Sequence, residues 1–441
     1  AGDAVNYKPD GITPYRMVGI PDGLGDFDNG DGTFTLLMNH ELGNTLGAVR
    51  AHGGTGSFVS RWVIDKESLQ VLNIQDLNNT YVTYTSGPGT SNTFSRFCSA
   101  DLPPITAFYN PITGNGSMSH IFMNGEESGS NGRAFANVVD ASGPGTGIGY
   151  ELPAFNGVGA WENLLAHPKA GNVLGDKTVV MGNSDGGRNG VYLYVGTKTN
   201  AGTEADKAGL NGGTLYAVSV NGVGSGVEDR NTPASGAFSL VAVQRNSSGT
   251  VTNGNTGTQF LRPEDGAWNP QNASEYYFVT TDRYDQTKDG VGTTIGRSRL
   301  YRLTFTDITH PELGGSISCL INATEGGQMF DNMTITPRGS IFLLEDVGNN
   351  AHNGKVWRYG IKSGKLEMVA EHDPLRFGDI GLAATAPFTQ DEESSGIIPL
   401  YDILGEGWLG CVVQAHYNIG DPELVEGGQL LLIHFPPGQE K

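Results

Sequence analysis

The stretch "RPEDGAWNPQNASEYYFVTTD", residues 262–282, decides the fold. It begins with a cation and two carboxylates, enters a short apolar strand, and reaches Asn-Pro and a turn. A second apolar strand then ends in an acid. Three other segments follow the same plan, beginning at Trp161, at Phe330 and, with an insertion, at Phe97. In three of the four segments an acid precedes a proline by six residues: Glu162 and Pro168, Glu264 and Pro270, Asp331 and Pro337.

The ends of the chain add two more second strands, in "TFTLLMNHE" (33–41) and "LGCVVQAHY" (409–417). About a dozen residues after each of the six second strands comes a third strand, led in five cases by glycine, as in "GVYLYVGT" (190–197). A unit of three or four strands that recurs without helical periodicity is typical of a β-propeller. We therefore predict an all-β chain, residues 1–441 forming a single propeller of six or possibly seven blades. The predicted blade cores lie near residues 20–65, 97–140, 161–197, 262–305, 330–361 and 392–435.

The composition agrees with this fold and excludes one class of partner. Glycine accounts for 66 of the 441 residues, as expected for many tight turns between short strands. The net charge of −20 repels phosphate backbones, so nucleic-acid binding is not expected. Since no apolar run approaches the length of a membrane span, we expect none, and we expect a monomer because no amphipathic helix suggests association.

The three cysteines, Cys98, Cys319 and Cys411, are too few for a disulfide framework and lack the spacing of a zinc site. One disulfide pair plus one special thiol stays open. The sequence begins "AGDAVNYKPD" without methionine, which fits either a processed, exported protein or a shortened chain. Residues 26–34, "DFDNGDGTF", resemble a calcium loop loosely, but Gly30 and Leu37 stand where oxygen ligands are needed, so a hairpin turn is expected.

The repeat predicts where the carboxylates meet. In a propeller blade the start of the innermost strand and the end of the antiparallel second strand lie on the same face. This places Cys98, Glu162, Glu264 and Asp331 in an inner ring around the axis. The acids that end the second strands are expected on the same face: Glu41, Glu126, Glu127, Asp185, Asp282, Glu345 and Asp346.

Converging carboxylates repel one another strongly unless cations neutralise them. Oxygen clusters suit calcium or magnesium, while a thiolate among carboxylates suits a transition metal such as iron. The ring therefore predicts a mixed, polynuclear metal site in the mouth of the central channel.

Several motifs together resemble the PhoX-type alkaline phosphatases. They are "LLMNHE" (36–41), "AHGGTGSFVSRWVID" (51–65), "FCSA" (97–100), "NGEE" (124–127), "RPED" (262–265) and "FDNM" (330–333), in the order found in that family. The resemblance covers roughly residues 20–430. It departs from the family around the cysteine, in "RFCSADLPPITAFYNP", and at Trp161, where the family tends to have histidine.

The resemblance implies a propeller that carries Fe3+ and Ca2+ in its mouth and hydrolyses phosphate monoesters outside the cytoplasm, periplasmic or secreted. Cys98 would be the thiolate on iron, and Glu162 and Glu264 its carboxylates. Arg262 would bind the substrate phosphate, and His416, Arg283 or Lys355 could replace a C-terminal lysine of the family. The further metal ligands, mostly for calcium, would be Asn39, Glu41, Glu126 and Glu127, with Asp331 and Asp346 less firmly assigned.

The mechanism that we expect is phosphoryl transfer to a metal-activated oxygen, with Arg262, Glu264 and Cys98 as the catalytic residues and a small phosphate ester as substrate. Two alternatives remain. One is a single-calcium propeller lactonase or phosphotriesterase, against which Cys98 speaks because such a site has no use for a thiolate. The other is a non-catalytic, calcium-stabilised propeller that binds a ligand, against which a free Arg262 guanidinium would speak.

Overall fold

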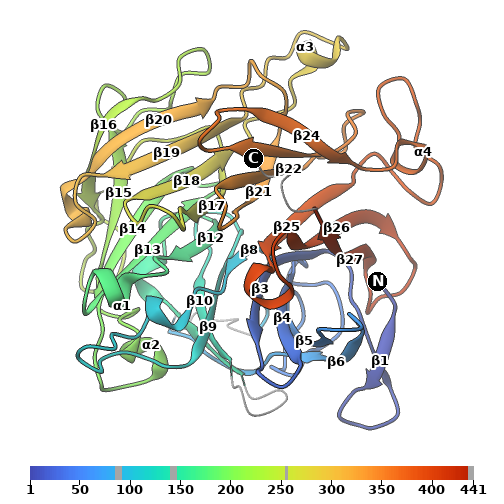
Figure 1. Cartoon of the computed structure of the whole chain (residues 1–441), viewed down its shortest axis with the longest axis horizontal. Helices are drawn as coiled ribbons and strands as arrows, with labels where there is room; N and C mark the ends of the chain where they lie inside the picture. Colours follow the sequence, from blue (N-terminus) through green and yellow to red (C-terminus); the bar gives the residue numbers. More distant parts are fainter. Residues whose placement is uncertain (85–91, 140–146, 254–256, 436–441) are drawn as a thin grey trace.

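Six blades are arranged in a circle about a central channel, as Figure 1 shows for the computed structural model of the chain, and two of the blades are joined in one nine-stranded sheet. The structure describes residues 1–84, 92–139, 147–253 and 257–435. The innermost strands β3, β8, β12, β17, β21 and β25 each contact the next, and β25 contacts β3, which closes the ring. The protein is therefore an all-β propeller with six blades. The sequence allowed six or seven blades, and the ring closes with six.

The first three blades lie in the first 242 residues, and each runs from the channel outward. In blade 1 the order is β3 (Pro21–Asp28), β4 (Thr33–His40), β5 (Phe58–Asp65) and β6 (Val71–Asp76). In blade 2 it is β8 (Phe97–Asp101), β9 (His120–Glu126), β10 (Ala134–Val139), β11 (Gly147–Glu151) and β7 (Asn78–Val82). In blade 3 it is β12 (Trp161–Ala166), β13 (Lys177–Ser184), β14 (Val191–Thr197), β15 (Thr214–Val220) and β16 (Gly236–Ala242).

The other three blades complete the circle. Blade 4 contains β17 (Pro263–Trp268), β18 (Glu275–Thr280), β19 (Arg299–Phe305) and β20 (Gly315–Ile321), and its β20 pairs with β16 of blade 3. Blade 5 contains β21 (Phe330–Ile335), β22 (Ser340–Glu345), β23 (Lys355–Gly360) and β24 (Leu366–Glu371). Blade 6 contains β25 (Glu393–Pro399), β26 (Trp408–Asn418) and β27 (Glu426–His434). Apart from residue 140, which lies outside the described residues, all six predicted blade cores are present.

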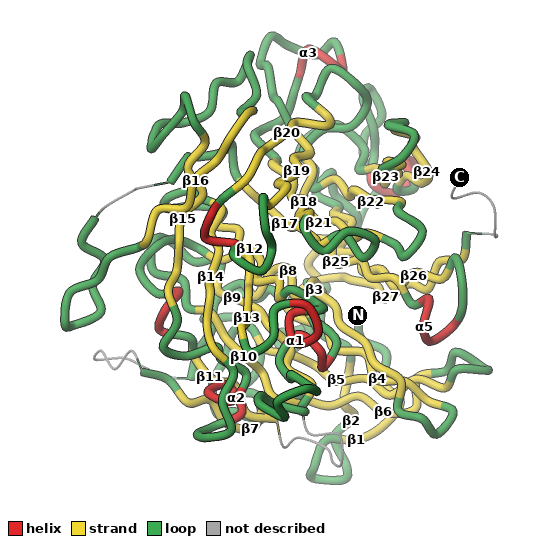
Figure 2. Tube along the Cα trace, turned by 60° about the vertical axis from the view of Figure 1, so that its left-hand side comes forward, coloured by secondary structure: helices red, strands yellow, loops and turns green. Residues whose placement is uncertain are grey.

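Helices are short, as Figure 2 shows, and lie in the connections. They are α1 (Ala170–Val173), α2 (Glu204–Lys207), α3 (Gln286–Asp289), α4 (Pro374–Phe377) and α5 (Tyr401–Leu404), with 3-10 turns at Ile105–Ala107, Pro153–Phe155 and Pro311–Leu313. None of the helices in the described ranges could span a membrane. A hairpin of β1 (Ala4–Tyr7) and β2 (Pro14–Arg16) precedes blade 1. Residues 29–32 form the predicted turn between β3 and β4.

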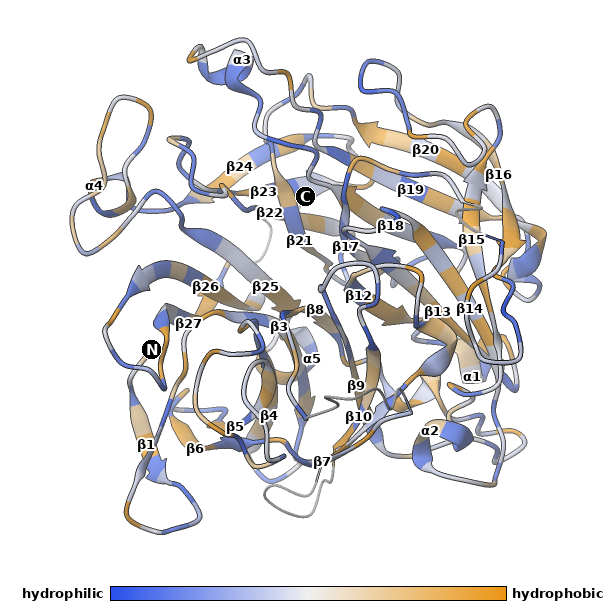
Figure 3. Ribbon diagram, turned by 180° about the vertical axis from the view of Figure 1, so that it is seen from behind, coloured by the Kyte–Doolittle hydropathy of each residue, from blue (hydrophilic) through white to orange (hydrophobic). Residues whose placement is uncertain are grey.

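Each pair of neighbouring blades encloses one apolar core. Leu36 and Met38 of blade 1 pack in the cluster that contains Val412 of blade 6, and Leu37 faces the other way, toward Phe97 and its neighbours in blade 2. Four further clusters join the remaining pairs of blades. Because both faces of each sheet are buried, the second strands are nearly continuous apolar runs, and Figure 3 shows much of the orange on the strands. Polar side chains are left to the strand ends.

All six innermost strands carry a register irregularity near their first residues, where the inner strand has one more residue than its partner. Such a bulge lets two successive residues reach the channel. The first of these positions holds Asp22, Cys98, Glu162, Glu264, Asp331 and Ser395, and the next holds Gly23, Ser99, Asn163, Asp265, Asn332 and Gly396.

Asp265 joins three blades. Its Oδ1 accepts hydrogen bonds from Asn163 Nδ2 of blade 3 at 2.5 Å and from its own blade's Gly266 N at 2.6 Å. Its Oδ2 accepts one from Met333 N of blade 5 at 3.0 Å. A carboxylate that accepts several donors is held in place although burial raises its pKa to about 7. Asp265 therefore has a structural role, whereas the sequence alone left this residue unexplained.

The cysteines are all free thiols. Cys319 lies on β20 and Cys411 on β26, in separate blades, so the disulfide left open by the sequence is absent.

We expect Asp265→Ala to lower the free energy of unfolding by about 2–4 kcal/mol, because buried donors on three strands lose their acceptor. Chemical denaturation followed by tryptophan fluorescence would measure the loss. Asp31→Ala, in the exposed turn after β3, is the matched control and should change it by less than about 0.5 kcal/mol. Equal stability of the two variants would contradict the bridging role of Asp265.

Candidate metal centre

One backbone arrangement recurs at the start of four innermost strands. The preceding residue is Ile20, Arg96, Arg262 or Met329, and each has a left-handed backbone with φ between 49° and 59°. The carbonyl of this residue accepts a hydrogen bond from the residue just past the second strand: Glu41 N, Glu127 N, Thr281 N and Asp346 N respectively. Left-handed conformations of non-glycine residues are costly and concentrate at functional sites. Here the left-handed residues and their hydrogen bonds hold the residues that follow the second strands beside the residues that begin the innermost strands.

Side chains from the starts of the innermost strands and from the ends of the second strands line a cavity of about 360 Å³ at the mouth of the channel. Carboxyl groups dominate its wall, and three cationic side chains, Arg96, Arg262 and His416, share it. The acids are Asp22, Glu41, Glu127, Glu162, Asp185, Glu264, Asp331, Asp346, Asp391, Glu393 and Glu426.

Within this wall the potential ligand atoms form three overlapping groups, each with all its atoms within 4.8 Å of one another. Cys98 belongs to two of the groups and Glu162 to two, so the groups follow one another around the ring. They are Asp22–Glu41–Cys98, Cys98–Glu127–Glu162 and Glu162–Glu264–Asp331. The predicted inner ring is thus brought together as a chain of adjacent sites.

Burial and mutual repulsion raise the pKa values of Cys98, Asp22, Asp331 and Glu127. Desolvation, with Glu41 and Glu162 nearby, holds the pKa of the Cys98 thiol well above its usual range. Desolvation followed by neighbouring carboxylates does the same for Asp22 and Asp331. For Glu127 the pKa is raised to about 8, by burial first and Glu41 second. A cation would remove this cost, because it favours the ionised forms.

Two buried oxygens in the wall have no hydrogen-bond donor among the described residues: Glu264 Oε1 and Gln414 Oε1. Arg262 Nη2 lies 3.4 Å from Glu264 Oε1, an ion pair without hydrogen-bond geometry. Buried acceptors normally have a partner, so these orphans point to a missing one. One thiol, several carboxylates and an amide oxygen form a donor set that fits hard cations together with a softer metal at the sulfur.

The cationic side chains stand on the rim. Arg262, with its side chain about half exposed, forks onto Asp185 through Nε at 3.0 Å and Nη2 at 2.7 Å. It reaches the mouth as predicted, but it is not the free guanidinium that the sequence suggested. Arg96 Nη2 contacts Glu127 Oε1 at 2.7 Å.

His416 is the one of three proposed lysine substitutes that lines the mouth. Although burial opposes the charge, hydrogen bonding to Glu393 and Glu426 raises the pKa of His416 to about 11. Its Nδ1 lies 2.7 Å from Glu426 Oε2. Arg283 instead donates to Ile295 O, and Lys355, the first residue of β23, donates to Asn353 O.

Asn39 and Glu126 are not brought into the cavity. Side chains on successive strand residues point to opposite sides, so Glu127 reaches the mouth and Glu126 points away from it. Both Glu126 oxygens are taken by Arg133, at 2.6 and 2.9 Å. Asn39 lies beneath the mouth and donates to Cys98 O at 2.6 Å, which positions the thiol-bearing backbone.

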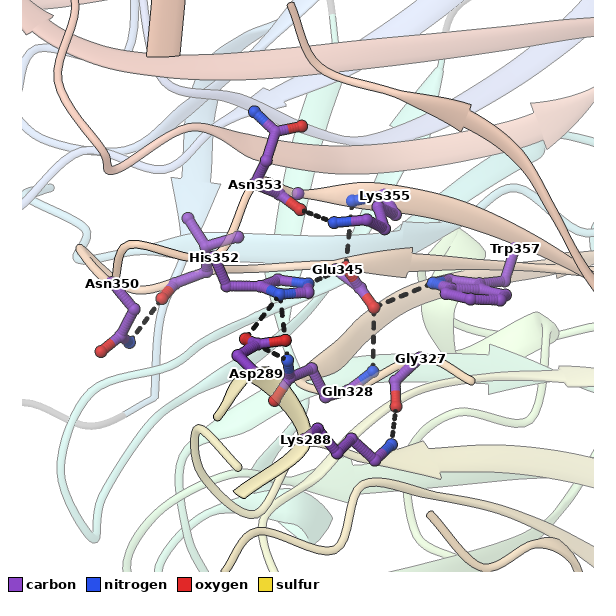
Figure 4. Close-up of polar contacts among 12 residues, drawn as sticks. Lys288, Asp289, Gly327, Gln328, Glu345, Asn350, His352, Asn353, Lys355 and Trp357 are labelled. Carbon is purple, nitrogen blue, oxygen red and sulfur yellow. Dashed lines mark hydrogen bonds and ion pairs between the residues drawn. The ribbon is translucent and has the colours of Figure 1, made fainter. Parts of the chain in front are cut away.

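Glu345 and Asp282 are likewise turned away, while Asp346 and Asp185 line the mouth. Figure 4 shows Glu345 enclosed by His352 and by Trp357, whose Nε1 donates to it at 2.8 Å. Asp282 forms a two-point contact with Arg230, at 2.7 Å on each side. In the neighbouring acids Glu126–Glu127 and Glu345–Asp346 the strand alternation turns the second toward the mouth.

The prediction omitted Asp22, Glu393 and Gln414, which complete the wall in blades 1 and 6. Asp22 could have been predicted from the sequence, because Pro21-Asp22 repeats Pro263-Glu264 at the start of an innermost strand. Gln414 Nε2 donates to Glu41 Oε2 at 2.9 Å and is near Glu393 Oε1 at 3.3 Å. No sequence pattern marks an amide at that position as a wall residue.

Comparisons with known proteins place the fold. No protein-family model and no curated protein matches the sequence. Among solved structures, Pseudomonas fluorescens PhoX in complex with vanadate, a transition state analogue, superimposes with a TM-score of 0.59 at 13% identity, covering 98% of this chain and 93% of that one. A putative 6-phosphogluconolactonase from Bacteroides uniformis gives a TM-score of 0.36 at 10% identity, over 90% of this chain and 99% of that one. The first similarity shows a PhoX-like propeller fold.

We expect the thermal stability of chelator-treated protein to fall as the pH rises from about 5 to 8. The folded pKa of Glu127 (about 8) and of Glu393 (about 7) lie above the ordinary 4.5, so the folded state binds more protons than the unfolded chain across this window. Adding calcium should abolish the fall. Differential scanning fluorimetry would measure it, and a melting temperature that rises with pH in the presence of EDTA would contradict the expectation.

Proposed function

We propose that the protein is a metal-dependent hydrolase of phosphate monoesters, with a cation cluster in the propeller mouth. The observation that carries the proposal is the chain of three overlapping ligand groups that share Cys98 and Glu162. A PhoX-like fold supports it, since the related structure holds vanadate, described as a transition state analogue. The expected ions are Fe3+ at the sulfur and Ca2+ among the oxygens. An extracytoplasmic location belongs to the same proposal.

Bound cations would neutralise the phosphate oxygens and supply an activated nucleophile. The chain's own residues do the rest. Cys98, Glu162 and Glu264 would hold the metals. Asp185 fixes the guanidinium of Arg262, whose half-exposed side chain faces the opening and can donate to a phosphate oxygen. Ser99 Oγ donates to Glu162 Oε1 at 2.6 Å and so fixes that ligand.

A single-calcium lactonase or phosphotriesterase is less well supported. One ion needs one group of ligands, whereas this mouth offers three connected groups and a thiol. The rim arginines do not argue against a non-catalytic, calcium-stabilised propeller, because Arg262 is paired with Asp185 and Arg96 with Glu127. The number of metal ions per chain therefore separates these alternatives.

We expect Arg262→Ala to lower kcat/KM for p-nitrophenyl phosphate roughly 5- to 30-fold, equivalent to about 1–2 kcal/mol, because a partly exposed cation that contacts the phosphate is lost. Arg230→Ala is the matched control: Arg230 forks onto Asp282 in the same way but lies outside the mouth. Steady-state kinetics of both variants would measure the difference. Equal kcat/KM values for the two variants would show that Arg262 does not contact the phosphate.

Elemental analysis of protein purified without chelators should find iron together with more than one calcium per chain. In Cys98→Ser the iron content should fall and the turnover of p-nitrophenyl phosphate should drop at least 100-fold, because the sulfur ligand is lost. Cys411→Ser, which alters a buried thiol in blade 6 away from the mouth, is the control. Full turnover in Cys98→Ser, or a single calcium without iron, would refute the proposed cluster.

A further inference from the structure

His352, in the connection between β22 and β23, contacts two carboxylates that belong to different blades. Its Nε2 lies 2.9 Å from Glu345 Oε2, at the end of β22. Its Nδ1 lies 2.9 Å from Asp289 Oδ2, at the end of α3 in the connection between β18 and β19 of blade 4. Figure 4 shows the imidazole ring between the two acids. The ring therefore links the connection that carries α3 to the neighbouring blade 5.

The position of the two acids decides the charge of the ring. A neutral imidazole donates from one nitrogen and has a lone pair on the other, so only the imidazolium can donate to both acids. The side chain of His352 is 7% exposed, which leaves water little access to replace either contact. Although burial opposes the charge, hydrogen bonding to Glu345 raises the pKa of His352 above its ordinary 6.5.

The other titratable groups around the ring are mostly acidic. They are Asp289 and Tyr284 from the α3 connection, Glu345 from β22, Lys355 from β23, Glu392 just before β25, and Asp379 after α4, beside the backbone of Asn353. Tyr284 donates to Asp289 Oδ2 at 2.9 Å, and among these groups only Lys355 opposes the charge of the ring. The surroundings therefore favour the imidazolium.

Gln328, just before β21 of blade 5, offers the Nδ1 atom a second partner. Its Oε1 accepts a hydrogen bond from Asp285 N at 2.9 Å, which fixes the orientation of the amide. Its Nε2 then lies 3.0 Å from His352 Nδ1 and 3.1 Å from Asp289 Oδ2. An Nδ1 atom without its proton can accept from Gln328 but can no longer donate to Asp289.

We propose that His352 is a proton-dependent clamp, which holds α3 of blade 4 against blade 5 while the ring is charged and releases it when Gln328 replaces Asp289 at Nδ1. Two further contacts join the α3 connection to the residues before β21. Asp285 N is bonded to Gln328, and Lys288 Nζ donates to Gly327 O. The release is therefore a local opening of α3 and leaves the blades together.

The clamp lies beside the mouth but outside the ligand groups, none of whose members His352 contacts. Glu345 Oε1 accepts a hydrogen bond from Gln328 N at 2.9 Å. The residues that follow these two, Asp346 and Met329, form the backbone hydrogen bond that shapes the mouth in blade 5. Opening of α3 therefore takes place next to this part of the mouth.

The direction of the pH dependence follows from the raised pKa of His352. The folded state binds the proton more tightly than the unfolded chain, so the clamp contributes its full stability below the ordinary 6.5. This contribution is lost as the pH rises through the pKa of the folded state. We therefore expect α3 to open on the alkaline side.

Hydrogen exchange of the calcium-loaded protein, followed by mass spectrometry at pH 6 and pH 9 and corrected for the intrinsic rate, tests the clamp. Protection of residues 286–296 should fall at least about 10-fold between these pH values, while that of α2, in another connection, should change less than about 3-fold. Asp289→Ala, at a partly exposed position, and His352→Gln should have low protection at both pH values. The matched controls Asp31→Ala and His310→Gln, at exposed positions, should behave like the wild type.

Four results would overturn the proposal. Protection of residues 286–296 that does not change with pH, or a wild-type profile in Asp289→Ala, would show that the contact does not hold α3. An equal loss of protection in α2 would make the change global. Nuclear magnetic resonance of histidine-labelled protein should give a titration midpoint above 6.5 for His352, and a midpoint below it would contradict the required charge. None of these measurements uses phosphatase activity, so the proposal stands or falls separately from the proposed function.

Discussion

The packing of each sheet against both of its neighbours is the constraint on which the molecule depends. Six apolar cores lie between six pairs of blades, and the last core joins Leu400 and Val412 of blade 6 to Leu36 and Met38 of blade 1. Since neither face of a sheet is free, polar side chains collect where the strands begin and end. The acidic mouth follows from this arrangement, because six innermost strands all begin there.

Gathering carboxyl groups in one place costs free energy because their charges repel one another. The structure shows which of them have a partner of opposite charge. Some acids are neutralised internally: Glu126 by Arg133, Asp282 by Arg230, and Glu345 by the cluster around His352. In the ligand groups the carboxylates outnumber the cations that contact them, which are Arg96 at Glu127 and Arg262 at Glu264, and the pKa values of Glu127, Glu162 and Asp331 are raised. This division separates groups that stabilise the fold from groups whose negative charge a bound cation would compensate.

The bulge at the start of each innermost strand places successive residues in the walls of two different cavities, the mouth and a second cavity of about 610 Å³ that all six innermost strands line. It allows one residue to face the mouth and the next to face the channel, as with Glu264 and Asp265. Glu264 has a buried oxygen without a donor at the candidate metal centre, and Asp265 joins three blades through hydrogen bonds. The same pair of positions in blade 5 holds Asp331, a potential ligand, and Asn332, which lines the second cavity.

The sequence by itself determined the propeller, the identity of the third strands, and the gathering of Cys98, Glu162, Glu264 and Asp331, because a repeat preserves register and register places equivalent residues at equivalent points. It could not choose between neighbours such as Glu126 and Glu127. That choice depends on which residue the strand alternation turns toward the axis, and a shift of one residue reverses it. The contributions of Glu393 and Gln414, the pairing of Arg262 with Asp185, and the second cavity also became visible only in the tertiary structure. These features arise from contacts between blades far apart in the chain, which no local pattern records.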